Sequence, residues 1–265
     1  MKPPRRSDLL WALVYLLVVL LGSGLVARKW TRLAGQPRKS SIFYTCEDPH
    51  TVALTFDDGP DNITSIGLDQ LIKANIPATF YLEGAETLRY PKLIRFMDSH
   101  PLFMLASHTF RHPNLAELNS SMAVSKELQD GFDALHSITG KRYRHFRLPY
   151  TSFDKFGVVE NSYQLAVDVY TIQVNDWLID HSVKTSHYPQ SEEEKVDLVA
   201  EMTLDGLREN FAAIQKTHNW SRGLIYLGHN RELVFRGLPK IIAYFRSQGF
   251  RFVRMDECTG VPETY

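Results

Sequence analysis

The stretch Val52–Pro60 constrains the fold of this chain more than any other. Its first five residues are apolar apart from one threonine and predict a buried strand. Two adjacent carboxylates, Asp57 and Asp58, follow directly, and a Gly-Pro pair then allows the backbone to turn. Because neighbouring strand residues point to opposite faces, both acids can serve one site only if the chain turns here. The stretch therefore predicts either a metal-binding acid beside a base or an ordinary solvated turn.

Apolar runs of strand length alternate with amphipathic segments along the rest of the chain. This alternation predicts an α/β fold with a mostly parallel sheet. The expected strands are Ala78–Leu82, Leu102–Leu105, Leu165–Val174, Leu224–Leu227 and Phe250–Val253, and the expected helices are Ser65–Ala74, Pro91–Ser99, Ser121–Ile138, Glu192–Gln215 and Leu238–Arg246.

The N-terminal 27 residues have the pattern of an export signal. Three basic residues precede an uncharged run from Leu9 to Ala27, which is just long enough to cross a hydrocarbon core of roughly 30 Å. We favour an uncleaved signal anchor, and a removed signal peptide is the alternative. Residues 28–41 are basic and polar and predict a linker. The rest of the chain is then exported, either membrane-anchored and facing the lumen or cell exterior, or secreted to the cell wall.

Charge and cysteine content narrow the possible partners and the cellular compartment. The 30 basic and 30 acidic residues give a net charge of +0, which argues against a nucleic-acid partner. Cys46 and Cys258, the only two cysteines, fit an oxidising compartment and predict a disulfide near the two ends of the domain. Two unrelated thiols are the alternative. The composition assigns no oligomeric state.

A pair of histidines, His108 and His112, directly follows the third expected strand. Side chains four residues apart can reach one ion if the backbone is helical or tightly turned. A zincin would need Glu where this chain has Thr109, so that motif is absent. Together with Asp58 the pair would supply two imidazoles and a carboxylate, which leaves coordination positions open for water and substrate. A surface histidine pair is the alternative.

Three more groups of chemistry-bearing residues follow extended segments. Arg147 could hold a carboxylate, Asp176-Trp177 offers an acid beside an apolar wall, and His229 offers a proton donor. Taken singly, they could be a surface ion pair, a core tryptophan and a loop histidine. Their ordered recurrence after successive strands is the arrangement in which α/β barrels place their active sites.

These residues together resemble the polysaccharide deacetylases of the NodB-homology type (carbohydrate esterase family 4), and the fungal chitin deacetylases most of all. The matching stretches run in the family's order over nearly all of the exported part. They are Thr55–Pro60, His108–Pro113, Arg147–Tyr150, Asp176-Trp177 and Leu227–His229.

The resemblance implies that residues 42–265 form a distorted (β/α) barrel that hydrolyses N-acetyl groups of a chitin-like, β-linked N-acetylglucosamine polymer. Asp58, His108 and His112 would bind a divalent metal, zinc or alternatively cobalt. Asp57 would be the general base, held by Arg147. His229 would be the general acid, oriented by Asp176. Trp177 and Leu227 would wall the acetyl methyl group, and the Tyr150 backbone N–H would face the oxyanion.

Three positions depart from the family pattern. Gln173 replaces an acid, Thr151 stands where many members have Gly, and Asn230 stands where an Asp often follows the histidine. None of them removes a proposed ligand or proton carrier. Two alternatives stay open: a non-catalytic or weakly active glycan-binding protein, and an O-acetyl (xylan-type) esterase on the same scaffold.

Overall fold

The computed structural model describes residues 42–43, 45–159, 165–166, 172–173, 204–205, 208 and 223–265. The N-terminal segment 1–41, most of the predicted helix Glu192–Gln215, and the site candidates Asp176 and Trp177 lie outside these residues. Within the described part of the chain, no helix combines the length and apolar character needed to cross a bilayer.

The centre of the fold is a parallel sheet built around β2 (Thr51–Asp57). Its strands follow the order β4-β3-β2-β7-β6, and β8 pairs with the first half of β2. The partner strands are β3 (Ala78–Leu82), β4 (Phe103–Ser107), β6 (Ile172–Gln173), β7 (Leu224–His229) and β8 (Arg251–Val253). A separate short pair joins β1 (Ile42–Phe43) to β5 (Leu165–Ala166). Every strand pair within these two sheets is parallel, so the carboxyl ends of the main sheet meet at one edge.

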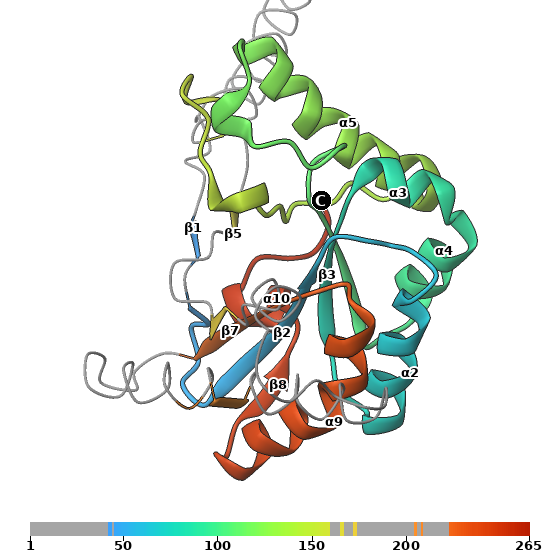
Figure 1. Cartoon of the computed structure of the whole chain (residues 1–265), viewed down its shortest axis with the longest axis vertical. Coiled ribbons are helices and arrows are strands. Elements are labelled where there is room, and N and C mark those ends of the chain that lie inside the picture. Colours follow the sequence, from blue (N-terminus) through green and yellow to red (C-terminus); the bar gives the residue numbers. More distant parts are fainter. Residues whose placement is uncertain are drawn as a thin grey trace, which may run out of the picture. The chain divides into compact units, whose positions relative to one another are not determined.

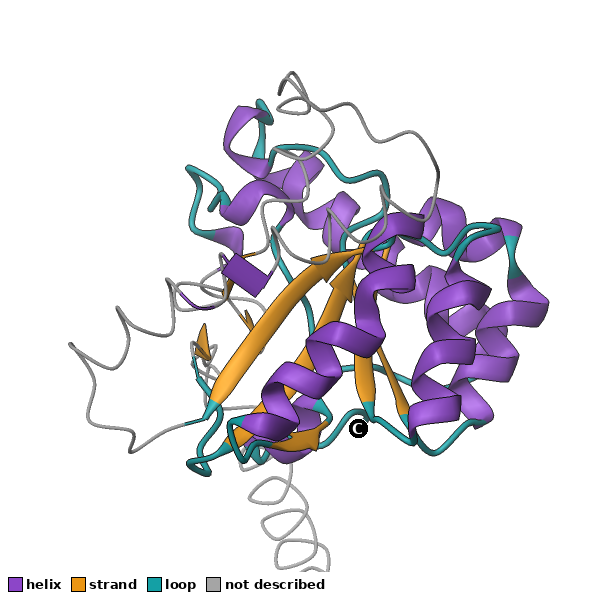
Figure 2. Ribbon diagram, turned by 60° about the horizontal axis from the view of Figure 1, so that its bottom comes forward, coloured by secondary structure: helices purple, strands orange, loops and turns teal. Residues whose placement is uncertain are grey.

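Helices cover the sheet and its carboxyl edge (Figures 1 and 2). On one face, α2 and α9 pack against each other closely enough that a methyl group on Gly67 would lie 2.5 Å from the Phe235 ring. The helices of the described residues are α2 (Thr64–Ala74), α3 (Gly84–Arg89), α4 (Pro91–Ser99), η1 (Leu115–Glu117), α5 (Ser121–Thr139), η2 (Pro149–Thr151), α9 (Glu232–Ser247) and α10 (Met255–Thr259).

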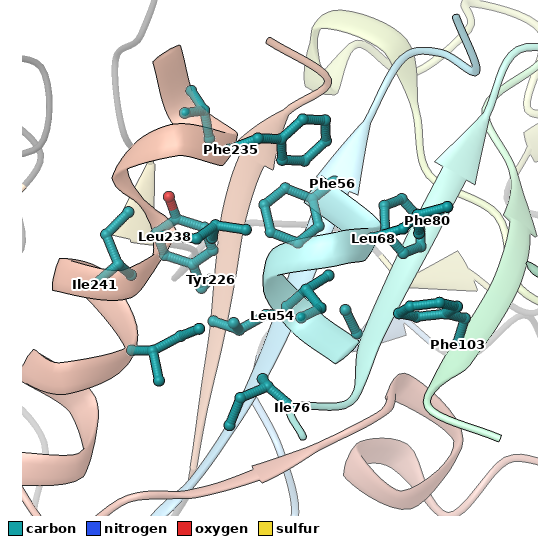
Figure 3. Close-up of a cluster of buried hydrophobic side chains, with 14 of the residues drawn as sticks. Leu54, Phe56, Leu68, Ile76, Phe80, Phe103, Tyr226, Phe235, Leu238 and Ile241 are labelled. Carbon is teal, nitrogen blue, oxygen red and sulfur yellow. The ribbon is translucent and has the colours of Figure 1, made fainter. Parts of the chain in front are cut away.

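The main core lies between the sheet and the α2–α9 pair. Figure 3 shows Phe56, Phe80 and Phe103 from three neighbouring strands pointing toward the same apolar cluster. The Phe56 ring contacts the Phe80, Tyr226 and Phe235 rings at centroid distances of 5.5, 6.2 and 5.3 Å. Burying each such ring stabilises the fold by about 1.5–3 kcal/mol. This packing holds β2 rigidly, and β2 carries the two acids.

Most predicted elements agree with the structure to within two residues. The predicted helix Leu238–Arg246 is wrong at its start, because α9 begins at Glu232 and continues through Pro239. The short helices α3 and α10 were not predicted, and the β-rich run Leu165–Val174 contains two short strands among its described residues. The α/β class with a parallel sheet is confirmed, whereas a distorted barrel is a finer prediction than the described strands test.

A disulfide links Cys46 to Cys258, with 4.4 Å between their Cα atoms. The predicted bridge is therefore present, and the alternative of two unrelated thiols is wrong. Cys46 also exchanges two backbone hydrogen bonds with Gly223, directly before β7. The bridge thus lies at the amino ends of the central strands, opposite the edge where the acids are found.

Candidate functional site

The carboxyl ends of β2, β4 and β7 bring the predicted site residues together. Asp57 ends β2, His108 follows β4 and His229 ends β7. Arg147 lies in an extended segment, in which Phe146 forms a parallel bridge with Ser107 at the end of β4. The sequence predicted these residues to lie just after successive strands, and the structure places them there.

The two neighbouring acids reach one site because the chain turns sharply between them. Asp57 still belongs to the strand, whereas Asp58 and Gly59 both have a φ of +69°. Positive φ is uncommon for a non-glycine residue such as Asp58. The Gly59 position is also crowded, because a methyl group there would lie 2.8 Å from the Asn230 amide carbon. The turn predicted from the sequence is therefore present.

Asp58, His108 and His112 form a group that could hold a metal ion. One ligand atom from each residue lies within 4.8 Å of the others. Asp58 Oδ1 is 3.8 Å from His108 Nε2 and 3.4 Å from His112 Nε2. Nitrogen and oxygen ligands lie about 2.0–2.2 Å from zinc, so two of them are roughly 3–4 Å apart. The three side chains are therefore spaced for a shared cation.

A buried oxygen of Asp58 supports the same conclusion. Asp58 Oδ1 is shielded from solvent, yet no donor among the described residues makes a hydrogen bond to it. An ionised oxygen in this position is costly unless a positive charge compensates it. A divalent cation between Asp58 and the two imidazoles would supply that charge, so the donor set fits a metal.

The local environment keeps both histidines in the neutral form that can bind a metal. His108 Nδ1 lies 2.9 Å from the Arg147 carbonyl oxygen, which can only accept, so Nδ1 carries the proton and Nε2 keeps its lone pair. Burial, followed by the nearby His112, lowers the pKa of His108 well below its usual value. Burial also lowers the pKa of His112, although Asp58 opposes the effect. Both imidazoles are therefore neutral near pH 7.

Asp57 lies beside this group and is held by Arg147. Arg147 Nη1 donates to Asp57 Oδ1 at 2.5 Å and to Thr55 Oγ1 at 2.8 Å. The guanidinium also lies 4.0 Å from the centre of the Tyr81 ring. The other carboxylate oxygen, Asp57 Oδ2, is 3.7 Å from His108 Nε2. One oxygen is thus anchored while the other lies next to the candidate metal position.

His229 and Leu227 approach from the neighbouring strand. In the parallel pairing of β2 with β7, Asp57 is opposite His229 and Thr55 is opposite Leu227. The Asn230 N–H then donates to the Asp57 carbonyl oxygen at 2.8 Å, which ties the two strand ends together. His229 is half-buried, and Leu227 is 5% exposed. The paired register brings an imidazole next to Asp57.

Tyr150 lies at the rim of the same site. Its φ is +55°, and its ring centroid is 4.8 Å from that of His112. The residue is 63% exposed, so it lies at the outer edge of the site, next to His112. Asp176 and Trp177, the remaining predicted site residues, lie outside the described part of the chain.

Some residues that shape the site were not predicted. Glu127 accepts hydrogen bonds from backbone N–H groups between the two histidines, and Thr109 Oγ1 accepts from the His112 N–H at 3.1 Å. Thr64 donates to the Asn230 side chain at 2.8 Å. In the sequence Glu127 is one of several charged residues on an amphipathic helix, and only its tertiary contacts distinguish it.

Comparison with known proteins shows the family to which this chain belongs. The profile described as "Polysaccharide deacetylase" matches residues 45–164. A chitin deacetylase of Colletotrichum lindemuthianum is 30% identical over 230 residues, which cover 83% of this chain and 84% of that protein. The chain therefore belongs to the polysaccharide deacetylase family, and the predicted enzyme class, a polysaccharide N-deacetylase, agrees with that membership.

Other relatives come from fungi and bacteria. A chitin deacetylase of a Pestalotiopsis species is 36% identical over 50% of this chain and 46% of that protein. A peptidoglycan-N-acetylglucosamine deacetylase of Bacillus cereus is 28% identical over 57% of this chain and 52% of that protein. The chain thus spans about half the length of these two relatives.

Solved structures share the fold. The chitin deacetylase from Colletotrichum lindemuthianum superimposes with a TM-score of 0.65 at 26% identity, covering 84% of this chain and 92% of that one. A pseudoenzyme of the same family from Bacillus anthracis has a TM-score of 0.62 at 20% identity, covering 82% of this chain and 68% of that one. Because a pseudoenzyme has this fold too, catalysis depends on the site residues and not on the fold alone.

Proposed function

We propose that this protein is a metal-dependent hydrolase that removes N-acetyl groups from a β-linked N-acetylglucosamine polymer of the chitin type. One observation carries the proposal. The Asp58–His108–His112 group, with its ligand atoms within 4.8 Å, lies directly beside the buried Asp57–Arg147 ion pair. A ligand set and an adjacent anchored carboxylate are what hydrolysis of an unreactive amide requires.

The cation is proposed to be zinc, with cobalt as the alternative, because two imidazoles and one carboxylate suit zinc and leave positions open. When bound, such an ion polarises an acyl oxygen and acidifies water. The contribution of the chain is to hold three ligand atoms in place and keep both imidazoles neutral.

Asp57 is proposed as the general base. Its anchored Oδ1 fixes the carboxylate, while Oδ2 lies near His108 and can take the proton of an attacking water. The Arg147 cation stabilises the ionised form needed to accept that proton. The buried hydrogen bond from Arg147 fixes the orientation of this carboxylate.

His229 is proposed as the general acid that protonates the leaving amine nitrogen. Its position opposite Asp57 in the strand pairing supports an acid and a base acting on the same bond. Asp176 would orient the imidazole, and Trp177 and Leu227 would enclose the acetyl methyl group. The Tyr150 N–H would donate to the oxyanion, where one such donor contributes roughly 3 kcal/mol.

The test is acetate release from N-acetylglucosamine oligomers by the purified protein, with zinc and with a chelator. We expect release with zinc, loss with the chelator, and loss in Asp57→Asn, which keeps the shape of the side chain but not its basicity. A zinc-loaded protein that binds the oligomers but releases no acetate would support the non-catalytic alternative and overturn the proposal.

A second comparison separates amide from ester hydrolysis. An ester leaving group has little need of protonation, so His229→Ala should slow an amide substrate far more than acetylated xylan. Equal slowing of both substrates would contradict the role of His229. Efficient cleavage of acetyl-xylan alone by the unaltered protein would identify an O-acetyl esterase.

We further propose that the domain acts outside the cytosol, on a polysaccharide, and that residues 1–27 anchor it in a membrane. The Cys46–Cys258 disulfide supports an oxidising compartment. Mass spectrometry of the N-terminus of the mature protein tests the anchor. Recovery of Met1 in the membrane fraction is expected, whereas a new N-terminus after about residue 24 would identify a cleaved signal peptide.

A further inference from the structure

We infer that Glu127, on α5, is a positioning residue that holds the loop Thr109–His112 in the shape needed for metal binding. The inference rests on the proposed metal site. Glu127 contacts none of the three proposed ligand side chains in the described interactions, and it acts on the backbone between two of them.

The loop needs support because its backbone is unusual. Thr109 and His112 have φ values of +68° and +57°, in a region that non-glycine residues rarely adopt. Such conformations persist only where surrounding structure enforces them. His108 is less dependent on the loop, because its own N–H donates to the Leu82 carbonyl at the end of β3.

Two helices satisfy the polar groups of the loop, α5 through the Glu127 side chain and α3 through its backbone. Glu127 Oε2 accepts from the Phe110 N–H at 3.2 Å and from the Arg111 N–H at 2.9 Å. At the start of α3, the Gly84 N–H donates to the Thr109 carbonyl and the Ala85 N–H donates to the Phe110 carbonyl, both at 2.9 Å. Among the described side chains, only Glu127 accepts hydrogen bonds from both the Phe110 and the Arg111 N–H groups.

The close approach of α5 puts Glu127 within reach. Gly131 lies one helical turn after Glu127 on the same face. A methyl group on Gly131 would be 2.8 Å from the Thr109 carbonyl carbon and 2.7 Å from Ser107 Oγ. The helix backbone therefore rests directly on the start of the loop, and Glu127 extends over its middle.

The expected consequence is selective loss of one ligand. Without the carboxylate, the N–H groups of Phe110 and Arg111 would turn toward water, and His112, the next residue, would lose its fixed direction. His108 and Asp58 would keep theirs, because each is held at the end of a core strand. Removing such supporting partners typically lowers metal affinity 10–100-fold, and we expect about tenfold because these bonds are partly exposed.

The test compares zinc affinity by calorimetry among variants of the whole protein. Glu127→Ala should bind zinc about tenfold more weakly than the unaltered protein. Glu127→Gln keeps an acceptor oxygen at the same reach and should restore most of the affinity. Asp130→Ala is the matched control, because it removes another carboxylate from the same helix. Among the described residues, the Asp130 carboxylate pairs only with the exposed Lys126. The zinc affinity of this variant should not change.

Glu127→Asp keeps the charge but is one methylene too short to reach the loop, so it tests the inference even if the alanine variant does not fold. It should lose as much affinity as Glu127→Ala, and the visible spectrum of the cobalt-loaded variant should show an altered ligand geometry. Unchanged affinity in both variants would overturn the role of Glu127 alone. Failure of the unaltered protein to bind zinc would overturn the proposed function and this inference together.

Discussion

Arg147 and Asp57 form an ion pair that is almost completely removed from solvent. Their side chains are 1% and 6% exposed, and Nη1 lies 2.5 Å from Oδ1. Burying two charges carries a large desolvation cost, so such a pair is not in itself a source of stability. Its position at the end of β2 indicates that it serves to fix Asp57 beside the histidines.

Replacing only one partner of this pair is expected to leave a buried, uncompensated charge. Arg147→Ala should therefore destabilise the fold by about 3–5 kcal/mol in urea unfolding. Acetate release, measured where the variant is still folded, should fall at least about a hundredfold because the base loses its orientation. The double variant Arg147→Met, Asp57→Asn is the control. It should regain much of the stability and none of the activity, and an Arg147→Ala protein as stable as the unaltered one would contradict the assignment.

The effect of Gly131→Ala on stability should have the opposite sign from the effect of the same substitution in an open helix. In an open helix, Ala in place of Gly is stabilising by about 1 kcal/mol. Here the added methyl group would press on the Thr109 backbone, so we expect a loss of about 1–3 kcal/mol and weaker zinc binding. Gly140→Ala is the control, because a methyl group there meets no described atom within 4 Å and only the φ of +74° is strained. It should lower stability without affecting zinc. Stabilisation by Gly131→Ala would show that α5 is free to move away.

The disulfide should contribute stability without contributing to catalysis. It closes a loop with a sequence separation of 212 residues, and in the chain-entropy model this corresponds to at most about 5 kcal/mol. Because the bridge lies at the amino ends of the strands, the double variant Cys46→Ala, Cys258→Ala should melt at a lower temperature and keep its rate of acetate release at a temperature where it is folded. A large loss of rate in the folded variant would mean that the two edges of the sheet are coupled.

Glu83 should make the stability of the metal-free protein depend on pH. Burial, and then the charges of Asp58 and Glu86, raise its pKa from 4.5 to about 7. The folded state therefore binds this proton more tightly than the unfolded state, and stability falls as pH rises from about 4.5 through 7. Glu83→Gln should thus raise the melting temperature at pH 8 and leave it nearly unchanged at pH 4.5.

Zinc provides the control for the Glu83 experiment. A cation on Asp58 would offset the repulsion between the two carboxylates, so the gain from Glu83→Gln at pH 8 should shrink when zinc is added. A gain that is equally large at pH 4.5 and pH 8 would show that the effect of the substitution is not electrostatic.

The strands, and the closeness of Asp58, His108 and His112, could be predicted from the sequence because their signals are local. Asp58 follows an apolar strand, and His108 and His112 have a fixed spacing, so topology alone brings them to one edge. Local signals did not reveal the start of α9, where a helix continues through Pro239. Nor did they single out Glu127, whose role depends on how closely α5 approaches through Gly131. Residues that act through contacts distant in sequence are not visible in a pattern of neighbours.

The pairing of β2 along its whole length has a consequence for how this scaffold could be altered. Its amino half is clamped between β7 and β8, and its carboxyl half between β7 and β3. A library of variants that leaves β2 unchanged could vary the surface loops at the carboxyl edge of the sheet. Variants with new glycan preferences could then be selected from it. The disulfide at the opposite edge of the sheet would supply additional stability. More destabilising loop substitutions would then be tolerated before the protein unfolds.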